Sequence, residues 1–272
     1  MRSTSVLDRR SSAADVSEGH DLLLLWQHPT TREIVPIGRF THDRGEFTFR
    51  YTRAAEMVEG LRPLPGLGDL HQTYRSDRLP AVFEQRVMEP TRPDYAEYLH
   101  DIGLDAMHAT PWEQIVHSGG ERAGDTLQFM QIPAVIDGRA RARFLVSGVR
   151  HVAGPDRVIA GRSVKVTDTQ HESALRSLHP GQSVRIEAEE GNQVDVCACV
   201  ATTDGVPLGW VPRALSASVR ELLDAGPVMA TVVRVGAEST PSHLRLVLDL
   251  DTPAPAGFEF DREGRWEPVA AQ

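Results

Sequence analysis

Short apolar runs and apolar–polar alternation dominate the first part of the chain, and they predict strands rather than long helices. Residues 22–26 form an unbroken apolar run of strand length, and aromatic residues alternate with polar ones over residues 46–51. A strand is also expected at residues 34–40. The turn sequence His-Asp-Arg-Gly at residues 42–45 separates it from the next strand, which predicts a hairpin.

Three short helices are expected after a Gly/Pro-rich connector at residues 60–78. The first, at residues 79–84, has a proline in its first turn, and the second spans residues 93–102 and stops at a glycine. The third begins with Thr-Pro-Trp-Glu at residues 110–113, which is a capping box with proline at the first helical position. This helix is expected to end at a Gly-Gly pair.

The second half of the chain combines more strands with two helices. Its predicted strands span residues 142–149, 184–188, 194–201, 206–211, 228–235 and 244–250. A capping box at residues 169–172 predicts the start of one helix, and the other is expected at about residues 216–223. Several short strands with two helices indicate a small, partly open barrel.

This pattern predicts an α+β protein of two domains with a tail at each end. The expected segments are a disordered tail at 1–20, an N-terminal module of strands and short helices at 21–138, a small β-barrel with two helices at 139–251, and a C-terminal tail at 252–272. Phe258, Phe260 and Trp266 could pack this last segment back as a hairpin. A length of 272 residues agrees with about two domains.

Composition narrows the class of protein. Hydrophobic residues make up 40% and charged residues 25%, which excludes wholesale disorder. No apolar run approaches the length of a membrane span, and the first twenty residues lack the apolar core of a signal peptide. Two cysteines are too few for a disulfide framework. We therefore expect a cytoplasmic protein without membrane contact.

The net charge of −9 argues against a wholly basic nucleic-acid-binding protein. The charge is uneven, however: −6 for residues 1–140, −1 for residues 141–251 and −2 for residues 252–272. Lys165 is the only lysine, so almost every cation is an arginine. Any phosphate contact in the near-neutral second domain must therefore come from a few arginines.

Familiar catalytic motifs are absent from the sequence. It contains no P-loop, no H-E-x-x-H, no G-x-S-x-G and no C-x-x-C. Cys197 and Cys199 are predicted to share one face of a strand, but two ligands do not make a metal site. We therefore predict no catalytic residue, no metal and no cofactor, and we expect a protein that is not an enzyme.

The segment 141–251 resembles a HIRAN domain. The matching residues are 144–151, 178–186, 189–198 and the run Gly-Trp-Val-Pro-Arg at 209–213, followed by a helix that ends at Gly226. HIRAN domains are small barrels found on DNA-remodelling and repair proteins, or alone in bacteria. The resemblance implies binding of single-stranded DNA, in some members at a free 3′ end.

Six residues are DNA-binding candidates. By position in the family, Arg150 and His151 would flank the phosphate and the end nucleotide, Asn192 and Asp195 would form a polar loop, and Trp210 would offer a stacking face. Arg213 is added because it follows Val-Pro and is expected to be exposed. The family's Asn-Pro-aromatic-Asp loop is Asn-Gln-Val-Asp here, so one stacking ring is missing.

The segment 21–135 resembles the N-terminal module of HipA-like kinases. Residues 37–40, 47–51, 79–84 and 120–128 match in order. In that family the module packs beside a kinase domain and contributes to contacts with a DNA-binding antitoxin partner. Because the chain continues into the barrel, kinase activity is not implied. Arg50 and Arg86, if exposed, would be candidates for contact with a protein partner.

Two functional hypotheses follow, and they belong to different classes. The first is an accessory protein of DNA repair or of phage or plasmid defence that binds single-stranded DNA or 3′ ends. The second is a protein–protein interaction module, or a regulatory subunit of a toxin–antitoxin-like system, without DNA contact. An unrecognised hydrolase is a third class, because the absence of known motifs does not exclude an unfamiliar active site.

Overall fold

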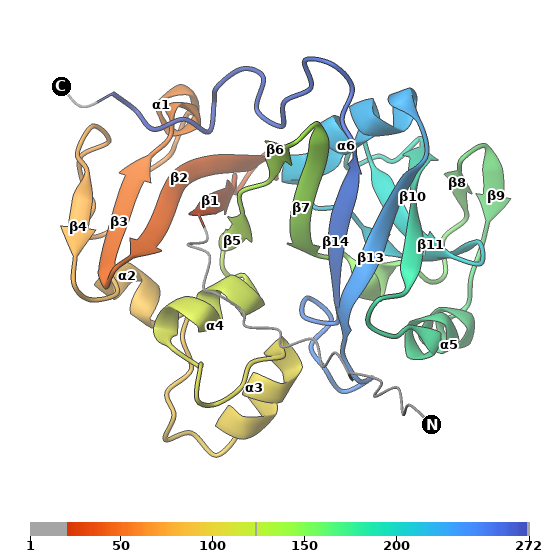
Figure 1. Ribbon diagram of the computed structural model, residues 1–272, viewed down its shortest axis with the longest axis horizontal. Helices are drawn as coiled ribbons and strands as arrows, with labels where there is room; N and C mark the ends of the chain where they lie inside the picture. The colour runs from red at the N-terminus through yellow and green to blue at the C-terminus, as the bar shows by residue number, and fades with distance from the viewer. Residues whose placement is uncertain (1–20, 123, 271–272) are drawn as a thin grey trace, which may run out of the picture.

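The computed structural model describes residues 21–122 and 124–270. In this part of the chain two antiparallel sheets and six α-helices form a mixed structure that is mostly strand (Figure 1). The α+β class is therefore confirmed. The predicted disordered tail at 1–20 lies outside the described residues. None of the described helices is long and apolar enough to cross a membrane.

The first sheet contains five strands in the order β4-β3-β2-β1-β5. They are β1 (Asp21–Gln27), β2 (Ile34–Asp43), β3 (Glu46–Tyr51), β4 (Tyr74–Ser76) and β5 (Leu127–Gln131). The predicted hairpin is present, because β2 pairs with β3 directly across the turn. Arg44 and Gly45 in that turn have φ values of 48° and 85°, the left-handed conformation that a two-residue hairpin loop requires.

Three of the four helices in this half pack on the first sheet and bury an aromatic core. The helices are α1 (Arg53–Met57), α2 (Ala81–Glu84), α3 (Tyr95–Ile102) and α4 (Pro111–Ser118), and α3 instead packs in a small separate cluster with Leu244. The ring of Phe40 on β2 lies 4.9 Å from that of Phe83 and 5.3 Å from that of Trp112, measured between centroids. The N-cap of α4 is confirmed, since the Thr110 side chain accepts a hydrogen bond from the Glu113 amide, and Pro111 occupies the first helical position. The return bond of the predicted capping box is not made, because the Thr110 amide donates to the His108 carbonyl.

The second sheet contains nine strands. Its main order is β12-β11-β10-β13-β14-β7-β6, and the hairpin of β8 and β9 is attached to β10. The elements are β6 (Ala134–Ile136), β7 (Arg139–Leu145), η1 (Val149–His151), β8 (Arg157–Ile159), β9 (Arg162–Val164), α5 (Asp168–Ser177), β10 (Ser183–Glu190), β11 (Cys199–Thr203), β12 (Val206–Trp210), α6 (Arg213–Ala225), β13 (Val228–Val235) and β14 (Leu246–Pro253). Among the described strands no continuous ladder closes a barrel. A single bridge between Ser147 and Trp210 links the end of the β7 segment to β12.

Two local predictions for the second half are wrong. The strand expected at 194–201 begins only at Cys199, because side-chain hydrogen bonds hold residues 192–198 in a turn. Cys197 therefore lies before the strand and does not share a strand face with Cys199. The cap of α5 is Thr167 with Gln170, two residues earlier than the predicted box.

β1 joins the two halves of the molecule. Leu22 and Leu24 belong to the aromatic core of the first sheet, whereas Leu23 and Leu25 belong to the core of the second sheet. All four side chains are at most 1% exposed. The unbroken apolar run of the sequence therefore reflects a strand with both faces covered.

The last segment of the chain returns from β14 to the first sheet (Figure 1). The amide of Arg53 donates to the Glu267 carbonyl at 2.9 Å, and the amide of Val269 donates to the Tyr51 carbonyl at 2.9 Å. Phe258 is buried in the second core on the way. The segment expected as a C-terminal tail thus carries backbone hydrogen bonds to α1 and β3.

Arg86 is not the exposed partner contact that the sequence suggested. It is 6% exposed, and its guanidinium donates to the carbonyls of Gly120 and Leu127 and to the Asp125 carboxylate. Burial lowers the pKa of Arg86, while the charge of Asp125 acts in the opposite direction. Arg86 therefore stabilises the loop that leads into β5.

We expect Arg86→Ala to lower the free energy of unfolding by about 3 kcal/mol, because Asp125 and two carbonyls lose their common donor. Urea unfolding followed by circular dichroism measures the change. The matched control is Arg50→Ala on β3, an exposed arginine whose removal should cost less than about 0.5 kcal/mol. Equal losses for the two variants would contradict the role assigned to Arg86.

Candidate functional site

Trp210, the last residue of β12, is held by the segment that follows β7. The amide of Trp210 donates to the Ser147 carbonyl at 2.8 Å, and the reverse hydrogen bond has the same length. Gly148 has a φ of 66°, and a Cβ atom there would lie only 2.7 Å from the Trp210 ring. Glycine is therefore needed at this position, because it allows the backbone to turn directly against the indole.

A buried carboxylate, Glu189, collects the groups around this ring. It accepts hydrogen bonds from Trp210 Nε1 at 2.6 Å, from Asn192 Nδ2 at 2.6 Å and from Arg157 Nη1 at 2.9 Å. The guanidinium carbon of Arg157 also lies 4.5 Å from the centroid of the Trp210 ring, a cation–π distance. Glu189 and Arg157 thus fix the indole from two directions.

Glu189 is ionised at neutral pH despite its burial. Burial alone raises the pKa of this carboxyl. The hydrogen bonds from Trp210, Asn192 and Arg157, together with the Arg157 charge, lower the pKa by more than burial raises it. The net result is a pKa below the ordinary value of 4.5. A charged Glu189 and a charged Arg157 therefore neutralise each other inside the site.

η1 places two of the candidates, Arg150 and His151, at the rim of this site. Arg150 and His151 are both exposed, and Arg150 Nε donates to His151 Nε2 at 3.0 Å. Arg157 Nη2 donates to the carbonyl of His151 at 2.7 Å, which connects η1 to the Glu189 network. The side chains of Arg150 and His151 remain on the solvent side of that connection.

The loop after β10 carries the two polar candidates. Asn192 Oδ1 accepts from the amides of Val194 and Asp195 at 2.8 and 3.0 Å, so its oxygen organises the turn. Asp195 Oδ1 in turn accepts from the amide of Cys197 at 2.9 Å. Val194 and Val196 project outward and are 68% and 87% exposed.

Hydrogen bonds therefore connect five of the six candidates through Glu189 and Arg157. Arg213 is the exception, since it lies at the first turn of α6 and donates to the carbonyl of Arg32 at 2.8 Å. Sequence reasoning missed Glu189 and Arg157. The apolar alternation of β10 over residues 184–188 offered no signal that the next residue is a buried acid.

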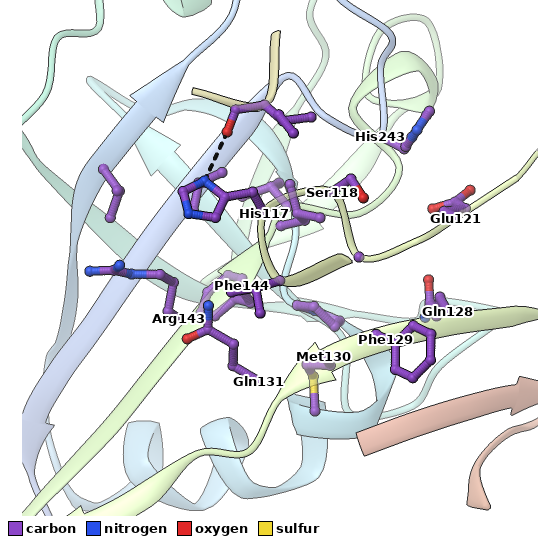
Figure 2. A pocket seen from close by; sticks show the side chains of 18 of the residues that line it. His117, Ser118, Glu121, Gln128, Phe129, Met130, Gln131, Arg143, Phe144 and His243 are labelled. Atoms are coloured by element: carbon purple, nitrogen blue, oxygen red, sulfur yellow. Dashed lines mark hydrogen bonds between the residues drawn. The ribbon is translucent and has the colours of Figure 1, made fainter. Parts of the chain in front are cut away.

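A large hollow, which we call the interlobe cleft, lies between β5 with α4 on one side and β7 with β14 on the other. It has a volume of about 2230 Å³. Figure 2 shows His117 of α4, Met130 and Gln131 of β5 and Arg143 of β7 around this space. Arg143 forms a bidentate pair with Asp249, with both N–O distances at 2.7 Å.

Two further basic groups in the interlobe cleft are strongly influenced by burial. Burial lowers the pKa of His117, whose Nδ1 lies 3.1 Å from the Ile102 carbonyl, and the charges of Arg234 and Arg143 add to that effect. Burial also lowers the pKa of Arg234 to about 10. At neutral pH His117 is therefore neutral and Arg234 remains charged.

Metal and thiol chemistry have little support in the described residues. Within 21–122 and 124–270 no group of three or more His, Cys, Asp or Glu side chains is arranged to hold a metal ion. Cys199 is buried, and burial raises the pKa of its thiol to about 12. The thiol is therefore protonated and is a poor nucleophile at neutral pH.

We expect Glu189→Gln to lower the free energy of unfolding by about 2 kcal/mol at pH 7, because three donors lose a charged acceptor. A lowered carboxyl pKa contributes stability above its ordinary value of 4.5, and that contribution is lost as the pH falls through the folded-state pKa. The difference between the two proteins should therefore shrink toward pH 3.

Urea unfolding across this pH range checks the expectation. Glu190→Gln, which changes the exposed neighbour on the same strand, is the matched control and should leave the acid dependence unchanged. A loss of stability in Glu189→Gln that does not change with pH would contradict an ionised Glu189.

Comparison with known proteins adds no relative to this picture. No protein-family model, curated protein or solved structure matches the chain. The resemblances to HIRAN domains and to the HipA N-terminal module remain predictions from the sequence, and the site is interpreted from its own geometry.

Proposed function

We propose that the protein is a non-enzymatic DNA-binding accessory protein that holds a single-stranded end at the Trp210 site. On this proposal the second sheet with α5 and α6 acts as a HIRAN-like barrel, and the setting is DNA repair or phage or plasmid defence in the bacterial cytoplasm. One observation carries the proposal. Three separate segments of the chain, which carry residues 150 and 151, 192 and 195, and 210, belong to one hydrogen-bonded network.

The indole of Trp210 supplies the stacking surface in this proposal. Trp210 is half-buried, and Glu189 and Arg157 hold its ring in one orientation. A rigid ring pays little conformational entropy when a base stacks on it. Each stacked base contributes about 1–3 kcal/mol.

Arg150 and His151 supply the phosphate contacts. Arg157 is a weaker candidate for this role, because its donors already bind Glu189 and the His151 carbonyl. Two contacts at the rim produce a small electrostatic footprint, which agrees with the near-neutral charge of the second half. The salt dependence of binding should accordingly be shallow.

The polar loop has two distinct roles. Both polar atoms of the Asn192 side chain bind within the network, so Asn192 acts as a positioning residue. Asp195 lies in the same turn, and its carboxylate is the acceptor we assign to a terminal hydroxyl. Val194 occupies the position of the family's ring and offers an apolar contact of smaller area.

The same two valines favour a second candidate function. Val194 and Val196 are exposed and lie two residues apart in the turn before β11, and apolar side chains of this kind also suit a protein interface. The alternative is a protein–protein interaction module or regulatory subunit without DNA contact, in which the N-terminal HipA-like module contributes to partner binding. A lack of DNA binding would favour this alternative.

Fluorescence anisotropy with three labelled probes tests the DNA hypothesis. The probes are a single strand with a 3′ hydroxyl, the same strand with a 3′ phosphate, and a blunt duplex, each of about 12 nucleotides per strand. We expect the 3′-hydroxyl strand to bind most tightly. Equal and weak binding to all three would contradict the proposal.

Trp210→Ala should weaken binding of the 3′-hydroxyl strand by about 1–3 kcal/mol, because one base loses its stacking partner. Trp210→Phe retains a ring but removes the indole N–H that donates to Glu189, and it should lose less affinity. Arg150→Ala should reduce the salt slope by about 0.7, the value for one phosphate contact on a single strand. Arg185→Ala, an exposed arginine of β10, is the control and should bind like wild type.

A further inference from the structure

The interlobe cleft arises where two strands of one hairpin-like segment separate. β6 pairs with the first residues of β7, whereas β5, which precedes β6, belongs to the first sheet. Below β6, β5 and β7 therefore diverge into different sheets (Figure 1). Residues of both strands line the cleft. Its volume of about 2230 Å³ exceeds the roughly 300–1,000 Å³ of a small-molecule pocket.

The interlobe cleft also reaches the Trp210 site. Its lining includes Gly148, which contacts the indole, as well as Arg150 and His151 at the rim. The path from this rim continues along β7 to Arg143 and Arg141. A chain bound at the rim therefore has a continuous space into which it can extend.

Charges in this cleft are separated between its two walls. Among the described lining residues, the wall from the second half carries Arg141, Arg143, Arg150, Arg213 and Arg234 against Asp249 and Asp251. The wall from the first half carries Asp43, Asp105, Glu113 and Glu121 against Arg44, and its fifth carboxylate, Asp125, is paired with the buried Arg86. One wall is therefore basic and the other is acidic. His117 adds no positive charge at neutral pH because its pKa is lowered.

A single nucleic-acid strand fits such a bipolar space. Its phosphate edge is negative, and its base edge presents amino groups that donate to carboxylate and amide oxygens. The acidic wall and the side chains of Gln128 and Gln131 supply those acceptors. A duplex carries phosphates on both outer edges, so one of them would face the acidic wall. An acidic peptide meets the same repulsion.

The arginines of β7 have a regular spacing that suits an extended strand. Arg141 and Arg143 are two residues apart on one face, which places them about 6.7 Å apart along β7. This distance is comparable to the separation of successive phosphates in an extended single strand. Arg143 pairs closely with Asp249, whereas Arg141 Nε lies 3.6 Å from Asp251 Oδ2. Arg141 is therefore the more easily recruited of the two.

We propose that the interlobe cleft is a second, sequence-independent subsite for a single strand whose end is held at the Trp210 site. The basic wall binds the phosphates, and the acidic wall excludes duplex. This inference rests on the proposed function, since it describes the path of the same ligand beyond its end.

A comparison of probe lengths distinguishes end binding at the Trp210 site from binding along the interlobe cleft. Single strands of about 4 and about 12 nucleotides, both with a 3′ hydroxyl, are titrated against wild type, Trp210→Ala, Arg141→Ala and the control Arg185→Ala. We expect the longer strand to bind at least tenfold more tightly. Arg141→Ala should remove most of that gain and leave the short strand unaffected, whereas Trp210→Ala should weaken both.

Each alternative result has a definite meaning. Equal affinities for the two lengths, or equal effects of Arg141→Ala and Arg185→Ala, would overturn the cleft subsite while leaving end binding in place. No binding of either length would overturn the proposed function itself. Tight binding of a labelled polyglutamate peptide that depends on Arg141 would replace the nucleic-acid occupant with an acidic protein segment.

Duplex binding tests the role of the acidic wall separately. Glu121 is exposed and lines that wall, so Glu121→Gln should strengthen binding of a blunt duplex several-fold with little effect on the single strand. The corresponding control is Glu190→Gln on β10, outside the cleft. A duplex affinity that is the same in Glu121→Gln, Glu190→Gln and wild type would contradict exclusion by the acidic wall.

Discussion

The structure depends on one strand that has no solvent-facing side. β1 pairs with β2 and β5 in the plane of the first sheet, and its side chains fill the core on both faces of that plane. Fully burying a leucine contributes about 1.5–3 kcal/mol, so the four leucines 22–25 bind the two halves through one short segment. A polar substitution on either face would disturb a core. The two halves therefore have separate cores that share the strand β1.

This shared strand also determines where the cleft and the Trp210 site lie. Because β5 is held against β1 and β7 against β14, the segment that links β5 to β7 must bridge two sheets, and the strands diverge. The chain after β7 then passes Trp210, where Gly148 permits close contact. Glu189 and Arg157 complete that contact as a neutralised pair. The positions of the cleft and of the Trp210 site therefore follow from the divergence of β5 and β7 into different sheets.

Turns and helix caps were predictable from the sequence, whereas side-chain contacts between distant segments were not. The hairpin at 42–45 and the cap of α4 depend on a few adjacent residues, and both are present. The strand predicted at 194–201 failed because an Asn side chain captured two backbone amides, which apolar alternation does not register. Arg86 and Glu189 are buried by partners about 20 to 40 residues away, so no local pattern marks them. For the candidate site, the sequence indicated side chains at the surface of the network but not the charged pair that holds them together.

The net charge of the whole chain is also a poor guide to the charge at the candidate site. A protein of net charge −9 is a poor candidate for nucleic acid when the charge is averaged over its surface. Most arginines near the site already bind carboxylates, as Arg157 does with Glu189 and Arg143 with Asp249, so a phosphate would have to displace a partner there. Arg150 instead donates to a neighbouring imidazole, and Arg141 has only a 3.6 Å contact with an exposed carboxylate. Near the site, the positive charge available to a ligand therefore lies at a few positions along β7 and η1, and this placement matters more for binding there than the total charge.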